Sequence, residues 1–392
     1  MPLESQLEII RRGTVGIIRE AELIEKLGRR RPLRVKLGVD PTSPHLHLGH
    51  TVVLRKLRQF QALGHQAVLI IGDFTALIGD PSGRSHTRPP VEPEQIRANA
   101  KTYLEQVGRV LDVGKLEIVW NGQWLGQLKF ADIIKLASKM TVARLLERDD
   151  FSQRYKSGNP ISLHELLYPL MQGYDSVMVR ADVELGGNDQ TYNLLVGRDL
   201  QEDAGQERQV CITMPILVGL DGTLKMSKSY GNQIALEDSP KDMFGKTMSI
   251  PDGLMRNYFE LLTEVPLGEV DSLIASDPRG AKERLAKEIV KSYHGEAAAE
   301  AAAAEFRRVF SQKELPADIP EVEVGAGPIS LSALLVRTGL ARSNREARRL
   351  LQQGGVALDG TRVEDPATQI EPASGMLLRV GKLKFVRLKV LP

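Results

Sequence analysis

The stretch LRVKLGVDPTSPHLHLGHTVVLRKLRQFQALGHQAVLIIG, residues 33–72, contains the pattern that decides the fold. Its first seven residues predict a buried strand, and AVLIIG at 67–72 predicts a second one. Between them, residues 48–63 place apolar side chains on one face and predict a helix that stops at Gly64. Strand, helix and strand in this order form a βαβ unit, so we expect an α/β fold with a parallel sheet.

The composition is that of an ordinary globular protein, with 392 residues of which 42% are hydrophobic and 26% charged. This length indicates two or three domains. No apolar run is as long as the roughly 18–20 residues that cross a bilayer, and the N-terminus lacks the pattern of a secretory signal. Cys211 is the only cysteine, which excludes a disulfide within the chain. We therefore expect a cytoplasmic protein without a membrane segment.

Basic residues are concentrated in the last part of the chain. From residue 329 to the end, 11 Lys and Arg residues face 5 Asp and Glu residues, a balance of +6 within a total of +2. This part predicts two short helices, the second capped by Ser343, and a hairpin that turns at Asp359-Gly360. A basic module on a mildly acidic body favours a polyanionic partner, although a solvated basic face would have the same charge.

The remaining pattern gives the domain organisation. Helices are expected at 94–111 and 131–147, a strand within 177–187, and a mostly helical region at 239–310. The Pro- and Gly-rich segment 314–328 has no helical period and predicts a linker. The expected parts are an α/β domain over 1–220 with an insertion near 125–165, a helical region over 221–320, a linker at 321–328 and a small α+β domain over 329–392.

Three of the seven histidines lie within PHLHLGH, residues 44–50, and admit three interpretations. A metal site is disfavoured, because no HExxH or CxxC pattern accompanies them. Exposed loop histidines without a role are the plainest alternative. The third interpretation uses position, because His47 and His50 share one side of a helix start that follows a strand, where phosphate binds in open α/β sheets. His45 does not share that phase, and Gly49 leaves room for a nucleotide to approach the backbone.

A second cationic element is LDGTLKMSKSYGNQI, residues 220–234, which places Lys225, Lys228 and Ser229 in a loop. Such a charge run usually faces solvent, so it is a weak signal alone. HLGH at a helix start and KMSKS about 175 residues later resemble the two signatures of the class I aminoacyl-tRNA synthetases. KMSKS matches that family's consensus without change, and HLGH differs from the commoner HIGH only by Leu for Ile.

The chemistry of that family explains these residue types. An amino-acid carboxylate attacks the α-phosphate of ATP and pyrophosphate leaves, so negative charge builds on the phosphate oxygens in the transition state. The resemblance implies that His47 and His50 serve the α-phosphate. It implies that Lys225 and Lys228, with Ser229 beside them, close over the pyrophosphate as a lid. ATP with Mg²⁺ is then a substrate, and we expect neither a metal site built by the protein nor a tightly bound cofactor.

Further segments resemble the tyrosyl-tRNA synthetases of bacteria, over nearly the whole chain. They are GVDPTSPHLHLGH, ALIGDPSGRSHTR, YPLMQGYDS (168–176) and LGGNDQTYN (185–193). Tyr168, Gln172 and Asp175 are spaced by four and three, hence on one helical face. Asp80, in a loop beside the carboxyl edge of the predicted sheet, is a candidate partner for the ammonium group of tyrosine. The resemblance implies that Tyr168 and Gln172 hold the same group. It implies that Asp175 accepts the phenolic hydroxyl and that Gln190 lines the pocket. Residues implied near ATP are Gly38, Asp40, Thr42, Gly49, Gly187, Asp189, Met226 and Lys228.

One position departs from the family pattern. Many members have a tyrosine that contacts the phenol where this chain has Lys36. If the two positions correspond, either Asp175 carries more of the hydroxyl recognition or Lys36 points elsewhere. The departure leaves a tryptophanyl-type synthetase open as an alternative.

The C-terminal module resembles the S-four-type RNA-binding domain, which tyrosyl enzymes commonly carry at this end. This supports tyrosine over tryptophan and implies that basic side chains meet tRNA phosphates. These side chains are Arg342, Arg345, Arg348 and Arg349.

The resemblance as a whole implies a Rossmann-like catalytic domain and a ligase that activates tyrosine with ATP and transfers tyrosyl to the 3′ end of its tRNA. It also implies a homodimer, with 125–165 as the expected interface. Two alternatives are another nucleotidyl transferase with the same His-x-Gly-His helix start and a non-catalytic RNA-binding relative. The basic module argues against the first, and the intact HLGH and KMSKS argue against the second.

Overall fold

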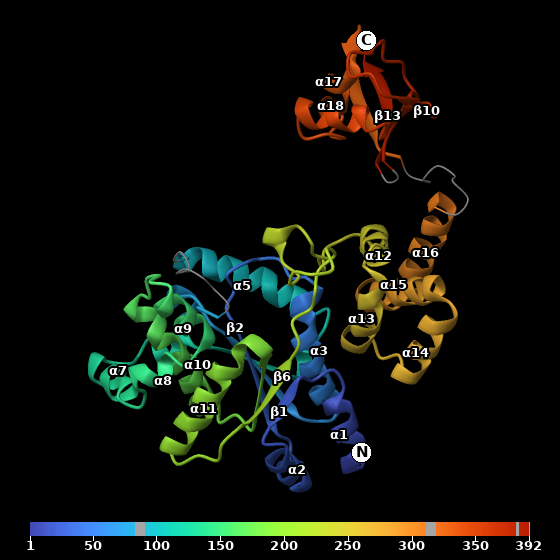
Figure 1. Cartoon of the computed structure of the whole chain (residues 1–392). Helices are drawn as coiled ribbons and strands as arrows, with labels where there is room; N and C mark the ends of the chain where they lie inside the picture. Colours follow the sequence, from blue (N-terminus) through green and yellow to red (C-terminus); the bar gives the residue numbers. More distant parts are fainter. Residues whose placement is uncertain (83–90, 311–318, 382–383, 392) are drawn as a thin grey trace. The chain divides into compact units, whose positions relative to one another are not determined.

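The computed structural model describes residues 1–82, 91–310, 319–381 and 384–391 (Figure 1). The chain forms two compact units, residues 1–300 and 301–392. The first unit therefore includes most of the expected helical region together with the α/β part, and a domain boundary at 220 stays a prediction. None of the helices in the described ranges is long and apolar enough to cross a membrane.

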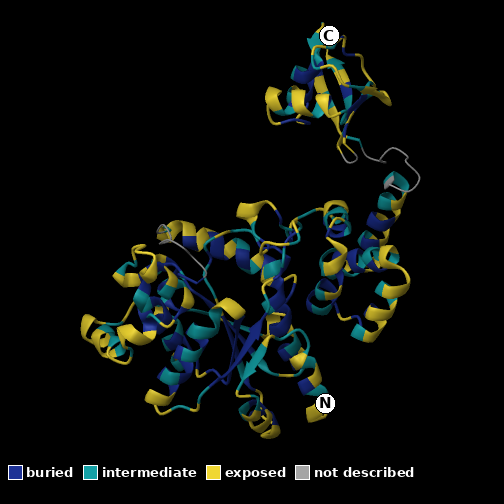
Figure 2. Cartoon of the chain, in the orientation of Figure 1, coloured by how far each residue is buried: buried dark blue, intermediate teal, exposed yellow. Residues whose placement is uncertain are grey.

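A six-stranded sheet forms the centre of the first unit, in the order β1-β6-β5-β2-β3-β4. The strands are β1 (Gly16–Ile18), β2 (Arg34–Val39), β3 (Gln66–Ile71), β4 (Leu116–Trp120), β5 (Val183–Gly187) and β6 (Val210–Met214). All neighbouring pairs are parallel except β1 with β6 at one edge. The central strands are mostly buried, as expected when helices cover both faces of a parallel sheet (Figure 2).

The predicted βαβ unit is confirmed. Helix α3 (Leu48–Ala62) joins β2 to β3, and its Leu54, Leu57 and Phe60 are fully buried, as the apolar stripe predicted. Helix α11 (Thr191–Asp203) joins β5 to β6 in the same way. The chain moves outward from β2 and from β5 in opposite directions along the sheet. Right-handed crossovers therefore place α3 and α11 on opposite faces (Figure 1).

Other helices of the α/β part are mostly short. They are α1 (Leu3–Arg11), α2 (Glu20–Gly28), α4 (Thr75–Ile78), α5 (Pro93–Val107), α6 (Gly122–Leu125), α7 (Phe130–Ala137), α8 (Val142–Leu145), α9 (Asp149–Lys156) and α10 (Leu163–Val179). The single helix expected at 131–147 is wrong, because α7 ends at Ala137. The hydroxyl of Thr141 accepts a hydrogen bond from the backbone N–H of Arg144, 3.2 Å away, and so caps the separate helix α8.

The mostly helical region expected at 239–310 is confirmed. Its helices are α12 (Pro240–Met248), α13 (Met255–Leu262), α14 (Leu267–Ser276), α15 (Pro278–His294) and α16 (Glu296–Phe310). Helix α12 packs on α15 and α13 on α14, with Phe244, Tyr258 and Leu285 fully buried.

Beyond α16, the described part of the second unit contains a five-stranded sheet, in the order β10-β9-β12-β13-β7, a two-stranded sheet of β11 with β8, and the helices α17 and α18. The elements are β8 (Ile329–Ser330), α17 (Leu331–Arg337), α18 (Asn344–Gln352), β9 (Val356–Leu358), β10 (Thr361–Val363), β11 (Gln369–Ile370), β12 (Leu377–Val380) and β13 (Lys384–Leu391). The predicted hairpin is confirmed, because β9 and β10 pair and both Asp359 and Gly360 have positive φ, 46° and 84°. Ser343 caps α18 as predicted, accepting from the N–H of Glu346 at 3.2 Å.

The expectation of a linker at 321–328 is wrong, because Glu321–Gly325 form strand β7. This strand pairs in parallel with β13, Val322 lying opposite Leu388, and Val324 is 1% exposed in the core of the unit. Glu and Val alternate in EVEV, so one face of the strand is apolar. The start of the expected linker, 314–318, lies outside the described residues.

Candidate active site

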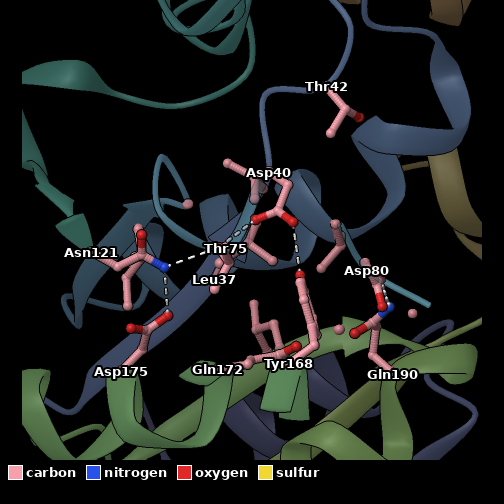
Figure 3. Close-up of a pocket in the computed structure, with 18 of the residues that line it drawn as sticks. Leu37, Asp40, Thr42, Thr75, Asp80, Asn121, Tyr168, Gln172, Asp175 and Gln190 are labelled. Carbon is pink, nitrogen blue, oxygen red and sulfur yellow. Dashed lines mark hydrogen bonds between the residues drawn. The ribbon is translucent and has the colours of Figure 1, made fainter. Parts of the chain in front are cut away.

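A cavity of about 250 Å³ opens at the carboxyl ends of β2 and β5. The chain departs from these two strands in opposite directions, and ligands bind at this position in open α/β sheets. Figure 3 shows polar side chains from several elements pointing into it. The predicted residues that line the cavity are Gly38, Asp40, Thr42, His50, Asp80, Tyr168, Gln172, Asp175, Gly187 and Gln190. The predicted residues that are not among its lining are His47, Gly49, Asp189, Lys225, Met226, Lys228 and Ser229.

Asp40, just after β2, is held by two hydroxyl groups. Tyr168 Oη donates to its Oδ2 at 2.9 Å, and Thr75 Oγ1 donates to its Oδ1 at 2.7 Å (Figure 3). Gly72 makes this possible, since a Cβ there would lie 2.1 Å from Oδ1 of Asp40. Burial, and then the carboxylates of Asp40 and Asp80, raise the pKa of Tyr168 well above its ordinary value. The Tyr168 hydroxyl therefore keeps its proton and acts as a donor.

Asp175 lies on α10 and is 3% exposed. Trp124 Nε1 donates to its Oδ1 at 2.8 Å, and Asn121 Nδ2 donates to its Oδ2 at 3.2 Å. Burial raises the pKa of Asp175 to about 6, against the opposing effects of Lys36 and these two donors. Sequence reasoning missed Asn121 and Trp124. The signal that could have found Asn121 is its place directly after β4, at the same edge of the sheet as the other site residues.

Asp80 is fixed through both of its oxygens. Gln190 Nε2 donates to Oδ2 at 2.8 Å, and the backbone N–H and hydroxyl of Ser82 donate to Oδ1 at 2.9 and 2.6 Å. The bonds from Ser82 form a local turn at Asp80. The rest of the family-like segment, residues 83–87, lies outside the described residues.

Lys36 points away from the cavity lining and is completely buried. Its Nζ lies 2.9 Å from Oε1 of Glu184, and it donates to Ser176 Oγ at 2.8 Å and to the carbonyl of Gln172 at 3.0 Å. Glu184 also accepts from the side-chain amide of Gln172 at 3.2 Å. The structure thus supports the alternative in which Lys36 points elsewhere than toward the phenol. Its ammonium links β2, α10 and β5.

The two histidines of HLGH cap the helix that they begin. His47 Nδ1 accepts from the N–H of Gly49 at 3.2 Å, and His50 Nδ1 accepts from the N–H of His47 at 3.2 Å. Because each Nδ1 is an acceptor, each neutral ring carries its proton on Nε2. Burial, and then the neighbouring His50, lower the pKa of His47 to about 3. Desolvation by the surrounding protein also lowers the pKa of His50, although its side chain is more exposed. At neutral pH both rings are uncharged Nε2–H donors.

Gly49 is required by the position of the His47 ring. A Cβ at Gly49 would lie 3.0 Å from Cε1 and Nδ1 of His47, tighter than ordinary contact, and 3.6 Å from Cβ of Met226. The ring centroids of His47 and His50 are 3.9 Å apart, so the two imidazoles form one packed pair over this glycine.

Backbone hydrogen bonds join the two signature segments. The N–H of Leu48 donates to the carbonyl of Ile234 at 3.0 Å, and the N–H of Leu236 donates to the carbonyl of Leu46 at 3.0 Å. The segment that follows KMSKS is therefore paired with the start of α3, although the two are far apart in sequence. His45 has no predicted role, and its Nδ1 lies 2.7 Å from Oε2 of Glu237 across the same pairing.

The KMSKS loop is anchored by its backbone and exposes its lysines. The N–H of Met226 donates to the carbonyl of Leu217 at 2.8 Å, and Met226 is buried. Lys225 and Lys228 are exposed, and neither makes an ion pair with any residue that the structure describes. The pKa of Asp189 is raised, mainly by burial and also by the charge of Asp80. The positive charge of Lys225 opposes this rise. Lys225 is therefore within electrostatic reach of Asp189, one of the residues implied near ATP.

The four arginines predicted to meet tRNA are exposed in the second unit. Three of them lie on α18, and Arg342 precedes it, its backbone N–H donating to Glu346 at 2.7 Å. Arg345, Arg348 and Arg349 are spaced as i, i+3 and i+4, so they share one side of α18.

Two family models match the chain. Residues 28–311 match the model of the class I tRNA synthetases (W and Y), and residues 311–387 match that of the tyrosine–tRNA ligase SYY-like C-terminal domain. The chain belongs to the tyrosyl-tRNA synthetase family. Membership confirms the resemblance stated from the motifs, and the second match covers the basic module that had been likened to an RNA-binding domain.

Relatives and solved structures agree with this membership. The tyrosine–tRNA ligase of Moorella thermoacetica is 55% identical over 98% of this chain and 95% of its own, and that of Thermotoga maritima is 53% identical over 99% and 98%. The structure of tyrosyl-tRNA synthetase from Archaeoglobus fulgidus, complexed with L-tyrosine, matches 77% of this chain and all of its own with a TM-score of 0.64 at 23% identity. A truncated mitochondrial tyrosyl-tRNA synthetase from Coccidioides posadasii matches 77% of this chain and 91% of its own, with a TM-score of 0.61 at 26% identity. The predicted Rossmann-like fold is thereby confirmed.

Proposed function

We propose that the chain is a tyrosine–tRNA ligase that forms tyrosyl-adenylate in the cavity between β2 and β5. The observation that carries the proposal is the convergence of residues predicted for tyrosine and for ATP on this one cavity, beside the paired HLGH and KMSKS segments. Full-length relatives with more than half of their residues identical are named tyrosine–tRNA ligase, which supports the same activity.

Tyrosine would lie with its phenol toward Asp175 and its ammonium toward Asp80. Both oxygens of Asp175 are already oriented by Trp124 and Asn121, so the carboxylate is a fixed acceptor for the phenolic hydroxyl. A site built to hydrogen-bond a hydroxyl discriminates against the analogue that lacks it by about 10⁴- to 10⁵-fold, a magnitude known for tyrosine against phenylalanine in this enzyme family. Asp80 supplies negative charge for the ammonium, with Tyr168 and Gln172 beside it.

The activation step needs donors where negative charge develops. A carboxylate oxygen of tyrosine bonds to the α-phosphorus of ATP while the bond to the bridging oxygen breaks and pyrophosphate leaves. The Nε2–H groups of His47 and His50 and the N-terminus of α3 would meet the α-phosphate, and Lys225 and Lys228 the departing pyrophosphate. One such donor is typically worth about 3 kcal/mol in the barrier.

Mg²⁺ would accompany ATP through the phosphate oxygens. Across the described ranges no three or more His, Cys, Asp or Glu side chains gather as a metal site. Mg²⁺ commonly keeps several waters and binds through nucleotide phosphates, which fits a site without a protein cage. No step depends on a protein-held ion.

In the second half-reaction, a ribose hydroxyl at the 3′ end of the tRNA attacks the tyrosyl carbonyl and AMP leaves. Arg342, Arg345, Arg348 and Arg349 are proposed to contact tRNA phosphates, which makes tRNA affinity dependent on salt. A cytoplasmic location is part of the same proposal.

A homodimer through residues 125–165 is also proposed. Three apolar side chains of this segment are strongly exposed, Phe130 and Leu163 at 78% each and Val142 at 61%. Exposed apolar surface of this kind is typical of a protein–protein interface. Sedimentation of the intact protein tests it, with a dimer expected and a monomer at micromolar concentration contradicting it.

Tyrosine-dependent exchange of pyrophosphate into ATP tests the main proposal. With a panel of amino acids, exchange is expected with tyrosine and not with phenylalanine or tryptophan. Exchange with tryptophan alone would establish the tryptophanyl alternative. Absence of exchange with every amino acid, in a protein that still binds tRNA, would establish the non-catalytic alternative.

A further inference from the structure

We propose that Arg148 is a positioning residue for the amino end of the substrate. Its guanidinium orients the groups that hold Asp80, the proposed partner of the tyrosine ammonium, without lining the cavity itself. The inference deepens the proposed function and rests on it, because it assigns a task to the site only if tyrosine binds there.

Arg148 belongs to the segment between α8 and α9, yet its side chain is directed inward and is 5% exposed. Its Nε donates to Oδ1 of Asp150 at 2.8 Å, and its guanidinium lies 5.1 Å from the centre of the Phe151 ring. Asp150 and Phe151 therefore fix the plane of the guanidinium. A side chain held in this way is preorganised for whatever its remaining N–H groups bind.

The first branch from Arg148 leads to one oxygen of Asp80. Nη2 donates to Ser82 Oγ at 2.6 Å, and the Ser82 hydroxyl donates in turn to Oδ1 of Asp80 at 2.6 Å. Nη2 also lies 3.7 Å from that same Oδ1. The guanidinium thus determines which way the serine hydroxyl points, and places a positive charge close to the carboxylate of Asp80.

The second branch leads to the other oxygen of Asp80. Arg148 Nη1 donates to Oδ1 of Asn193 at 2.9 Å, and Asn193 Nδ2 donates to Oε1 of Gln190 at 3.0 Å. Gln190 Nε2 then donates to Oδ2 of Asp80 at 2.8 Å. Asn193 Nδ2 also donates to Oε1 of Gln172 at 2.9 Å, so the same branch reaches a second proposed tyrosine contact.

The direction of these bonds follows from Arg148. A guanidinium has only donors, so Asn193 must turn its oxygen toward Arg148 and its NH₂ toward the two glutamines. Each glutamine must then turn its oxygen toward Asn193, which leaves the NH₂ of Gln190 for Asp80. Gln190 is also oriented by Asp80, and Gln172 by Glu184, because a carboxylate only accepts. Arg148 therefore chiefly fixes Asn193. Without Arg148, the Asn193 amide could turn its oxygen toward the two glutamine oxygens, which is repulsive and would loosen Gln190 from its place beside Asp80.

The identity of the residue matters because both branches start from one planar fork. Nη1 and Nη2 bond different partners while Nε bonds a third. A lysine ammonium carries the same charge without this geometry, so it can serve at most part of the network.

The test uses two variants of the full-length protein, Arg148→Met and Arg148→Lys. Arg144→Met is the matched control, because Arg144 lies on the adjacent α8 with an exposed side chain paired to Asp199. Calorimetry measures the affinity of three ligands for each variant. They are L-tyrosine, tyramine, which lacks the carboxylate, and 3-(4-hydroxyphenyl)propionate, which lacks the ammonium.

Arg148→Met is expected to weaken L-tyrosine and tyramine by about 10- to 100-fold, the range for lost bonds to a charged group. The ligand without an ammonium is expected to change by less than about 3-fold, Arg148→Lys to be intermediate, and Arg144→Met to match the unmodified protein. Equal weakening of all three ligands would show a general structural role and overturn the inference, as would unchanged tyrosine binding with only tRNA transfer impaired. Failure of the unmodified protein to bind tyrosine would instead refute the proposed function.

Discussion

The hydroxyl of Tyr168 donates a hydrogen bond to Oδ2 of Asp40 at 2.9 Å, and this bond joins the two sides of the cavity. Tyr168 comes from the middle of α10, on the side proposed for tyrosine, whereas Asp40 follows β2, on the side proposed for ATP. Tyr168 and Asp40 are 128 residues apart in sequence. Their hydrogen bond thus connects a residue proposed to hold tyrosine with one proposed to hold ATP.

Tyr168→Phe removes this bond and leaves the aromatic ring in place. The Oδ2 of Asp40 then loses a donor, so we expect kcat/KM for tyrosine in pyrophosphate exchange to fall by about 10- to 100-fold. Tyr192→Phe is the control, because the Tyr192 hydroxyl donates to the backbone carbonyl of Arg144 and Tyr192 does not line the cavity. Equal kinetics for the two variants would contradict the role given to the Tyr168 hydroxyl.

Tyrosine binding is expected to weaken as the pH falls through about 6. Burial raises the pKa of Asp175 to about 6, so below that pH the carboxyl is protonated and no longer a charged acceptor for the phenol. The ammonium of tyrosine does not titrate in this range, and the lowered pKa values of His47 and His50 keep both rings neutral. The dissociation constant should therefore rise by up to about 10-fold per pH unit below 6. Calorimetry between pH 5 and 8 measures it, and the Asp175→Asn variant should bind more weakly with a flat profile.

Gly49→Ala is expected to slow activation without unfolding the protein. The new Cβ would meet the His47 ring at 3.0 Å, so the ring must move and its cap on α3 is disturbed. We expect the exchange rate at saturating substrates to fall by about 10-fold or more, since a displaced donor no longer fits the transition state. Gly28→Ala, at the end of α2 with open space around it, is the control. A rate for Gly49→Ala equal to that of the control would show that the ring position is not critical.

Lys228→Ala should lose most of the activation rate while the affinity for tyrosine survives. The Lys228 side chain is exposed and contributes nothing to the tyrosine end of the cavity, so its charge acts only when pyrophosphate departs. Stopped-flow measurement of adenylate formation gives the rate, and equilibrium binding gives the affinity. Lys156→Ala removes an exposed lysine elsewhere and serves as the control. Unchanged kinetics in Lys228→Ala would refute the lid role.

Local patterns predicted the parts of the fold and of the candidate site that depend on neighbours in sequence. The βαβ unit follows from apolar periodicity over 33–72, and the common face of Tyr168, Gln172 and Asp175 follows from helical spacing. The Asp359-Gly360 turn follows from the φ values that a two-residue hairpin requires. In each case the physical cause acts within a few residues, so it is visible in the sequence.

Features that depend on distant partners could not be predicted in this way. Strand β7 was taken for a linker, because its parallel pairing with β13 bridges about 65 residues and nothing near Glu321–Gly325 reveals it. No local pattern singles out Arg148, and only the structure brings it to Ser82 and Asn193. The direction of Lys36 could likewise not be chosen from sequence, since its partner Glu184 lies on another strand.

Lys36→Met is expected to destabilise the protein far more than it changes tyrosine binding. Glu184 is 1% exposed, and removal of the ammonium leaves its carboxylate buried without a cation, at a cost of about 3–5 kcal/mol. Urea denaturation measures the loss, and the double variant Lys36→Met/Glu184→Gln should recover much of it because no buried charge remains. Lys36 does not line the cavity, and the double variant removes both the Lys36 charge that lowers the pKa of Asp175 and the Glu184 charge that raises it. The double variant should therefore bind tyrosine within about 3-fold of the unmodified affinity. A large loss of affinity with little loss of stability would mean that Lys36 acts on the phenol after all.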